Sequence, residues 1–308
     1  MSLRTLLNRY QPDGQRSKLG DVSDTSLAFW LLLPATLLLG LIVVYPVAKV
    51  IHDSFYSMSI FSEHGPAFIG FANYADALRD PDVWRAVRFT LALCIVTVPG
   101  ALLVGLGLAL LANRPWTWRW PVRLALLLPW ALPLAFSGMI FAWFFNTEYG
   151  VVNDLLRRAG VAPISFLLIP QWGFLAICIA TIWKTSSFVA LILLAGLQTI
   201  PRSLYEAAEL EGASHWQSFR HVTLPLLMPA MMVALIFRTI SALQSFDIPY
   251  AMTQGGPARY TETLSILINT TAIEYMDVGY GSALAVLLFL LSMAVSSLYL
   301  RKLYKGTV

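Results

Sequence analysis

Residues 199–225 read TIPRSLYEAAELEGASHWQSFRHVTLP, a polar stretch between two long apolar runs of the chain. Within it, Ser203 is followed three residues later by Glu206, and this spacing matches a capping box, which starts a helix. Gly212 is placed to end that helix in the left-handed conformation that glycine adopts without strain. We therefore expect a short helix over residues 203–212 rather than a loose connection.

A second short helix is expected in the same stretch. Ser214 and Gln217 form another capping box, and the helix is expected to reach Phe219. Pro225 then falls in the first turn of the following apolar helix, where its missing N–H costs nothing. The stretch predicts a helix–turn–helix unit suited to docking into a groove of a partner.

The alternative for the first helix is an amphipathic helix that lies on the membrane surface. Such a helix carries Lys or Arg on its polar face, whereas the polar residues here include Glu206, Glu209 and Glu211. Anionic lipid repels this charge, which disfavours the membrane-surface interpretation.

Outside this stretch the chain is too apolar for a soluble protein. Of its 308 residues, 57% are hydrophobic and 12% are charged, whereas soluble domains carry about 25% charged residues. Cys94 and Cys178 lie inside apolar segments and predict no disulfide framework. Six segments have the roughly 20 mainly apolar residues that cross a bilayer, and they cover 27–51, 86–112, 124–145, 173–198, 224–248 and 280–300. The sequence thus predicts an all-α integral membrane protein with six transmembrane helices.

The distribution of charge orients these helices. Six spans put both termini on one side, and that side holds twelve Lys and Arg residues against seven on the other. The positive-inside rule then predicts cytoplasmic termini and a cytoplasmic 199–225 stretch. Residues 1–26 and 301–308 are predicted to be cytoplasmic tails of a membrane domain that covers 27–300. Because residues 1–26 lack apolar periodicity, we expect them to be dispensable for that domain.

The third apolar segment contains the helix breakers Pro129, Pro133 and Gly138. Membrane helices tolerate such residues where neighbours or water satisfy the freed carbonyls. Two interpretations are open, a kink that serves helix packing and a bend that lines a pathway.

Polar side chains inside the fourth segment are candidate pathway residues. Lys184 lies near its middle, with Thr181, Thr185 and Ser187 at nearby helical positions. Trp183 offers an aromatic face. In the alternative interpretation, Lys184 only satisfies partners inside the bundle and Trp183 only packs.

The fifth segment carries a second polar stripe. Ser241, Gln244 and Asp247 follow one another at spacings of three residues, which places them on one arc of a continuous helix. Arg238 is nine residues from Asp247 and half a turn out of phase, so we expect it outside this stripe. Internal partners are again the alternative for Asp247.

Seven anchors of the 199–225 stretch follow the pattern E-A-A-x3-G-x9-hydrophobic-x-L-P. They are Glu206, Ala207, Ala208, Gly212, Val222, Leu224 and Pro225. This pattern resembles the signature loop of permease subunits in binding-protein-dependent ABC importers. Residues 182–185, 194–201 and 246–257 are similar to the carbohydrate-uptake branch, which serves maltose, other oligosaccharides, related glycosides and glycerol phosphates.

The resemblance implies a type I ABC importer transmembrane fold in a bacterial or archaeal cytoplasmic membrane. It also implies a sugar substrate, a second homologous permease subunit, two ATP-binding subunits and an extracytoplasmic solute-binding protein. The helix with Glu206 would be the coupling helix, seated in a cleft of one ATPase. The residues Gln254, Gly255, Gly256 and Pro257 would shape the external gate and the binding-protein surface.

The chain lacks a Gly-x4-Gly-Lys-Ser/Thr phosphate loop, so we expect ATP and magnesium only on partner subunits and no cofactor, metal or nucleic acid on this chain. An ion-coupled secondary transporter of six spans is the main alternative function, although such folds usually show inverted repeats and more spans. An intramembrane enzyme is disfavoured because all four histidines fall outside the predicted spans. A channel is disfavoured because no filter loop or ring of like charge is visible.

Overall fold

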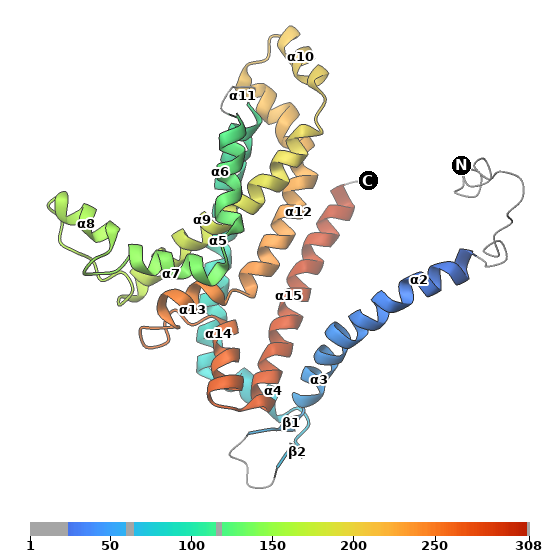
Figure 1. Ribbon diagram of the computed structural model, residues 1–308, viewed down its shortest axis with the longest axis vertical. Helices are drawn as coiled ribbons and strands as arrows, with labels where there is room; N and C mark the ends of the chain where they lie inside the picture. Colours follow the sequence, from blue (N-terminus) through green and yellow to red (C-terminus); the bar gives the residue numbers. More distant parts are fainter. Residues whose placement is uncertain (1–23, 60–64, 115–118, 307–308) are drawn as a thin grey trace, which may run out of the picture. The chain divides into compact units, whose positions relative to one another are not determined.

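The computed structural model describes residues 24–59, 65–114 and 119–306, and nearly all of this part of the chain is helical (Figure 1). The chain divides into two units, residues 1–50 and 51–308, which we describe separately. Most of the predicted tail 1–26 falls outside the described residues, so its dispensability stays a prediction.

The first unit is one long apolar helical run. It contains α2 (Asp24–Leu39), the π-helical turn η2 (Gly40–Val44) and the start of α3 (Tyr45–Asp53), which continues into the second unit. Ser26–Asp53 is long and apolar enough to cross a membrane, in agreement with the predicted span 27–51.

The second unit holds the remaining elements. The antiparallel strands are β1 (Tyr56–Ser57) and β2 (Ala67–Phe68). The helices are α4 (Ala72–Arg79), α5 (Pro81–Asn113), α6 (Arg119–Ala131), α7 (Leu134–Phe144), α8 (Val151–Arg158), α9 (Pro170–Gln198), α10 (Arg202–Leu210), α11 (His215–Ser218), α12 (Leu224–Leu243), α13 (Asp247–Thr253), α14 (Leu264–Asn269) and α15 (Val278–Gly306), with π-helical turns η3 (Phe219–Thr223) and η4 (Thr270–Glu274). In Figure 1, α10 and α11 lie at one end of this unit and the β1–β2 hairpin at the other.

Membrane-length helices account for most of the predicted spans. The described residues contain five of them, and a sixth if the bent pair α6 and α7 is one span. The helix that corresponds to the predicted fifth span, 224–248, covers His215–Leu243 and so begins and ends earlier than predicted. α15 continues as a helix to Gly306, and the cytoplasmic tail over 301–308 stays a prediction.

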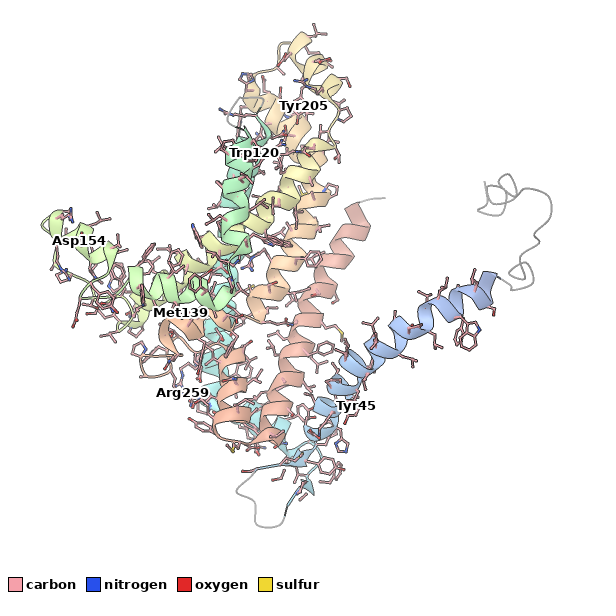
Figure 2. All side chains as sticks on the ribbon, in the orientation of Figure 1. Tyr45, Trp120, Met139, Asp154, Tyr205 and Arg259 are labelled. Atoms are coloured by element: carbon pink, nitrogen blue, oxygen red, sulfur yellow. The ribbon has the colours of Figure 1, made fainter. Side chains whose placement is uncertain are left out.

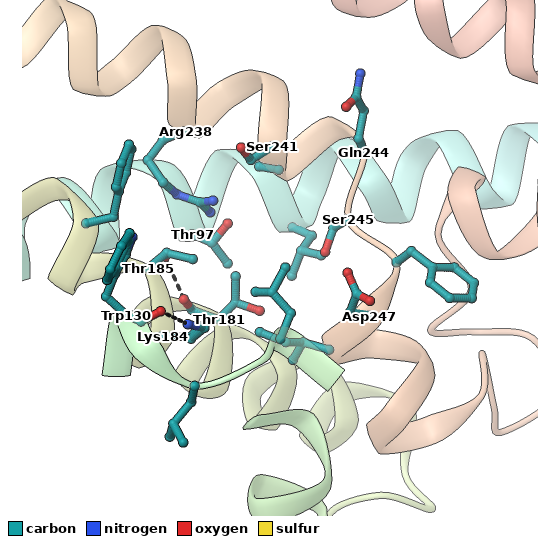
Figure 3. Close-up of a pocket in the computed structure, with 17 residues that line it drawn as sticks. Thr97, Trp130, Thr181, Lys184, Thr185, Arg238, Ser241, Gln244, Ser245 and Asp247 are labelled. Carbon is teal, nitrogen blue, oxygen red and sulfur yellow. Dashed lines mark hydrogen bonds between the residues drawn. The ribbon is translucent and has the colours of Figure 1, made fainter. Parts of the chain in front are cut away.

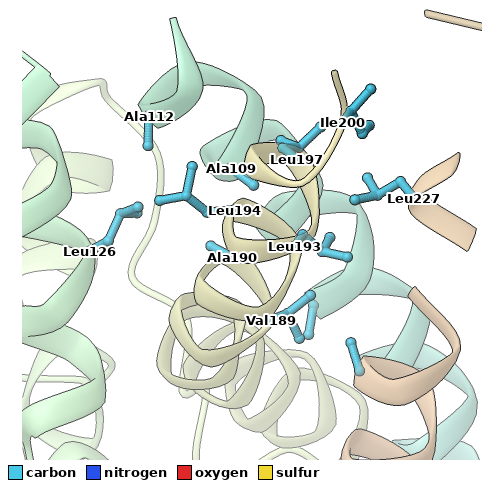
Figure 4. Close-up of a cluster of buried hydrophobic side chains, with 12 residues drawn as sticks. Ala109, Ala112, Leu126, Val189, Ala190, Leu193, Leu194, Leu197, Ile200 and Leu227 are labelled. Carbon is cyan, nitrogen blue, oxygen red and sulfur yellow. The ribbon is translucent and has the colours of Figure 1, made fainter. Parts of the chain in front are cut away.

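Close contact between α5 and α9 forms the centre of the bundle. Ala101, Gly105 and Ala109 recur every fourth residue on α5 and are buried, which puts small side chains on one face. A Cβ added to Gly105 would lie 2.6 Å from Cγ1 of Val189 on α9, too close for any larger residue. Small residues of this kind let membrane helices approach closely. Figure 4 shows the same packing extended by Leu193 and its neighbours.

Two further apolar clusters hold the outer helices. Phe141 of α7 and Ile248 of α13 pack with Ile177 of α9. Leu264 of α14 and Leu284 of α15 pack against the first part of α5. These contacts position the short helices α7 and α13 beside the middle of the bundle.

Candidate functional site

A break in the third predicted span forms one wall of a cavity. α6 ends at Ala131, α7 begins at Leu134, and the two helices differ in direction by 97°. Pro133 has no N–H, so the carbonyl of Pro129 four residues earlier has no helical donor. The bend expected from the breakers in the predicted span 124–145 is therefore present, as a break after Ala131.

Lys184 of α9 supplies the missing donor. Its Nζ donates to the carbonyl oxygens of Pro129 at 2.5 Å and Trp130 at 3.0 Å, and the residue is only 6% exposed. The ammonium also faces the negative end of the α6 dipole. Ser187, one turn further along α9, donates to the carbonyl of Leu126 at 2.6 Å and so faces α6. Lys184 thus lies inside the bundle, as expected.

Beside this break lies a cavity of about 610 Å³ (Figure 3). Its walls come from α5, α9 and α12, from the α6–α7 break, and from the break between α12 and α13. Lys184 is the central residue of the 29-residue α9, so the cavity lies near the middle of the span. Its polar lining consists of Thr97, Thr181, Lys184, Thr185, Arg238, Ser241, Gln244, Ser245 and Asp247. Hydroxyl and charged groups therefore converge on one space inside the membrane domain.

The second polar stripe is divided by a break in the chain. α12 ends at Leu243, Gln244 is its C-terminal cap, and Asp247 is the first residue of α13. The prediction of a continuous helical stripe through Ser241, Gln244 and Asp247 was therefore wrong. All three residues nevertheless line the cavity, because the chain bends around it.

Arg238 lines the same cavity, although the sequence placed it outside the stripe. The expectation that Arg238 and Asp247 lie on opposite faces requires an unbroken helix between them. The helix ends after Leu243, so the two residues no longer share one helical phase. A signal for Arg238 was present in the sequence, since Ser241 follows it by three residues on the same helical face.

Trp183 does not line the cavity. Its ring packs against Phe141 of α7 with centroids 5.3 Å apart and an interplanar angle of 58°. The alternative interpretation of Trp183 as a packing residue therefore fits the structure. The aromatic lining comes instead from Trp130, Phe188 and Phe246, which sequence reasoning missed.

The first helix of the 199–225 stretch is α10. It begins at Arg202, because the Leu204 N–H bonds to the carbonyl of Pro201 at 3.2 Å and closes the first turn. The predicted capping box at Ser203 was wrong, since Ser203 lies inside this turn and no side chain caps the helix. The predicted left-handed end is present, with φ +77° at Gly212.

The end of α10 is well defined. The N–H of Ala213 bonds to the carbonyl of Ala208 at 2.9 Å and that of Gly212 to Glu209 at 3.0 Å, which is a Schellman motif. Tyr205, labelled in Figure 2, ties α10 to η3 through a 3.0 Å hydrogen bond between its hydroxyl and that of Thr223. Leu210 projects from the end of α10 and is 90% exposed.

The second capping box is confirmed. The backbone N–H of Ser214 donates to Oε1 of Gln217 at 2.7 Å, and the N–H of Gln217 donates to the Ser214 hydroxyl at 3.3 Å. The helix does not stop near Phe219 but continues through η3 into α12. Pro225 lies in the first turn of α12, as predicted, although α12 follows η3 without a break.

The remaining anchors have different exposure. Glu206, Ala207 and Pro225 are exposed, while Ala208 and Leu224 are half-buried. The loop therefore presents an acidic and apolar surface at one end of the bundle.

The predicted turn over 254–257 lies at the end of α13. Gln254 and Gly255 are both left-handed, with φ of 50° and 83°. The Thr261 hydroxyl donates to the carbonyl of Gly256 at 2.6 Å, which holds the turn against the chain that follows Pro257.

Charged residues tie this turn to the start of α5. Arg259 pairs with Glu262 at 2.9 Å and with Asp82, and Asp82 also pairs with Arg85 at 2.5 Å. Burial raises the pKa of the Glu262 carboxyl above its ordinary value, while Arg259 acts in the opposite direction. Burial also acts to lower the pKa of Arg259, but Glu262 and Asp82 raise it overall.

A helical membrane bundle with a polar cavity at mid-span and a structured helix–turn–helix at one end defines the membrane subunit of a solute transporter. The family model for "Binding-protein-dependent transport system inner membrane component" matches residues 101–305. The chain belongs to this family and is the permease subunit of a binding-protein-dependent ABC sugar importer.

Two relatives and one solved structure illustrate the family. The sulfoquinovosyl glycerol transport system permease protein SmoG of Agrobacterium fabrum is 57% identical over 91% of each chain. The trehalose/maltose transport system permease protein MalF of Thermococcus litoralis is 37% identical over 90% of this chain and 94% of its own. A bacterial ABC transporter involved in the import of the acidic polysaccharide alginate shares the fold, with a TM-score of 0.81 at 22% identity over 92% of this chain and 96% of its own.

Membership of this family excludes the alternative function, an ion-coupled secondary transporter. The protein is a multi-pass component of the inner membrane that works with a periplasmic binding protein and ATPase partners. As a permease subunit it has no catalytic domain and binds no cofactor.

Proposed function

We propose that this permease carries a sulfonated glycoside of the sulfoquinovosyl glycerol type through the cavity between its broken helices. The cavity lining carries the proposal, because hydroxyl groups such as those of Thr185 and Ser241 suit sugar hydroxyls. Its volume of about 610 Å³ is within the range of small-ligand sites. The choice among glycosides follows SmoG, which is named for that solute and is 57% identical to this chain.

Transport in this proposal needs a complete complex. A second, similar permease forms the other half of the pathway, two ATP-binding subunits lie in the cytoplasm, and both termini face them. α10 is the coupling helix, and the exposed Leu210 and Ala207 enter an apolar cleft of one ATPase. The turn over 254–257 shapes the external gate and contacts the binding protein.

Uptake by the reconstituted complex tests the substrate. The complex and its cognate binding protein are placed in proteoliposomes loaded with ATP-regenerating mixture, and labelled sulfoquinovosyl glycerol or trehalose is supplied on the binding-protein side. We expect ATP-dependent uptake of sulfoquinovosyl glycerol that excess unlabelled trehalose does not inhibit. Uptake of trehalose or maltose with none of the sulfonated glycoside would overturn the proposed substrate.

A further inference from the structure

Arg238 is a buried cation for which the described residues supply no ion-pair partner. The residue is 5% exposed, and its Nε and Nη2 have no hydrogen-bond partner within the described part of the chain. No ion pair to Arg238 is present among the described residues, although Asp247 lines the same cavity. An unpaired charge inside a membrane protein is costly and marks a functional site by default.

Lys184 gives a direct comparison inside the same cavity. Its ammonium has two carbonyl acceptors, so its presence is explained by the break in α6. The described residues offer no such explanation for Arg238. Its side chain is almost fully enclosed and lines the cavity, so the cavity is the space from which another group can reach it.

Two hydroxyls beside Arg238 are also unpartnered. Oγ1 of Thr97 on α5 and of Thr181 on α9 are buried and have no hydrogen-bond partner among the described residues. Figure 3 shows the Arg238 and Thr97 side chains extending from α12 and α5 into the cavity. Three helices therefore bring unsatisfied donors to one space. Lys184 and Arg238 against Asp247 leave one net positive charge in its lining.

We propose that Arg238, with Thr97 and Thr181, binds the anionic group of the glycoside in transit, a sulfonate in the proposed substrate. The guanidinium offers several N–H donors in a planar fork, which suits an oxyanion with more than one acceptor oxygen. A neutral sugar leaves the charge of Arg238 unpaired, so the site selects anionic glycosides. The choice of sulfonate rests on the proposed function, whereas the choice of an anion rests on the geometry of the cavity.

Transport of a matched pair of solutes tests the site. Glucosyl glycerol has a hydroxyl where sulfoquinovosyl glycerol has the sulfonate. In the reconstituted complex, we expect Arg238→Gln to lower sulfoquinovosyl glycerol uptake by roughly tenfold or more, with Arg238→Lys losing less. Any uptake of glucosyl glycerol should not fall. Arg88→Gln is the control, since Arg88 is exposed on α5 and outside the cavity, and it should transport as the wild type does.

Thermal unfolding of the complex without its binding protein supplies a second measurement. We expect Arg238→Met to raise the melting temperature of the empty complex, because it removes an unpaired buried cation. The increase that sulfoquinovosyl glycerol or methanesulfonate gives the wild type should be lost. Wild-type uptake and stabilisation in Arg238→Gln would overturn the inference. If the wild type carries another solute, the substrate proposal fails. Methanesulfonate then tests the anion site alone: if it does not raise the melting temperature of the wild-type complex, the anion site is overturned as well.

Discussion

Lys184 is a cation held inside the membrane by backbone carbonyls. The proline at 133 removes an N–H from the helical ladder, and the ammonium takes its place at 2.5 Å from the carbonyl of Pro129. Hydrogen bonds from a charged donor are stronger than neutral ones, and the α6 dipole adds to them. The broken span therefore depends on a residue 55 positions away in the chain.

Replacing Lys184 should loosen this wall of the cavity. Lys184→Met leaves two carbonyls in the membrane without donors, at a cost of about 3 kcal/mol. We expect a lower melting temperature of the purified complex and weaker uptake. Lys184→Arg retains N–H donors and should lose less of both. An unchanged melting temperature in Lys184→Met would show that the carbonyls find other donors. This direction is opposite to that expected for Arg238→Met, because only Lys184 already has partners.

α10 is a short helix with a defined end. Its Schellman motif requires the left-handed backbone of Gly212, at φ +77°. No atom of the chain lies within 4 Å of a Cβ added there, so a substitution at Gly212 acts through the backbone and not through a clash within the subunit. The orientation of the exposed Leu210 follows from this end, which links backbone geometry to the proposed docking.

Gly212→Val should separate ATP hydrolysis from transport. A β-branched residue disfavours positive φ, so the end of α10 unwinds at a cost of about 1–2 kcal/mol. We expect the permease to insert in the membrane while ATPase subunits dissociate or hydrolyse ATP without uptake. Gly212→Asn is the matched control, because asparagine adopts the left-handed region more readily. Co-purification of the ATPase and uptake are measured together. Wild-type values of both in Gly212→Val would exclude α10 as the coupling element.

The bundle as a whole is organised around the contact between α5 and α9. Small residues at every fourth position of α5 bring the two backbones together. In turn, α9 carries Lys184 to the break in α6 and Thr181 to the cavity. Close helix contact thus fixes the spacing of two walls of the cavity.

A larger residue at this contact should disturb the entire membrane domain. Gly105→Leu places a side chain where even a Cβ meets Val189 at 2.6 Å, so the helices must separate. Overpacking of this kind costs about 1–3 kcal/mol, and we expect a lower melting temperature and lost uptake. Gly107→Leu is the matched control, since nothing lies within 4 Å of its added Cβ. Equal stability of the two variants would contradict the packing argument.

The spans, the loop chemistry and the family could be predicted from the residues alone. A bilayer demands long apolar helices, so composition and length revealed five of the six spans as helices. Gly212 and the Ser214–Gln217 capping box depend on neighbours within a few residues, and both were predicted correctly. The 199–225 anchors identified the family that the comparisons then showed.

The set of residues that line the cavity depended on contacts between helices. Helical phase predicts which residues share a face only along an unbroken helix, and the break after Leu243 ended that relation for Arg238 and Asp247. The Trp183 ring packs against Phe141, a residue more than forty positions away in the sequence. A pattern of neighbouring residues cannot predict that contact. Helix caps and helix ends are determined by residues that are adjacent in the sequence. The orientation of a side chain inside the bundle depends on which distant helix packs against it.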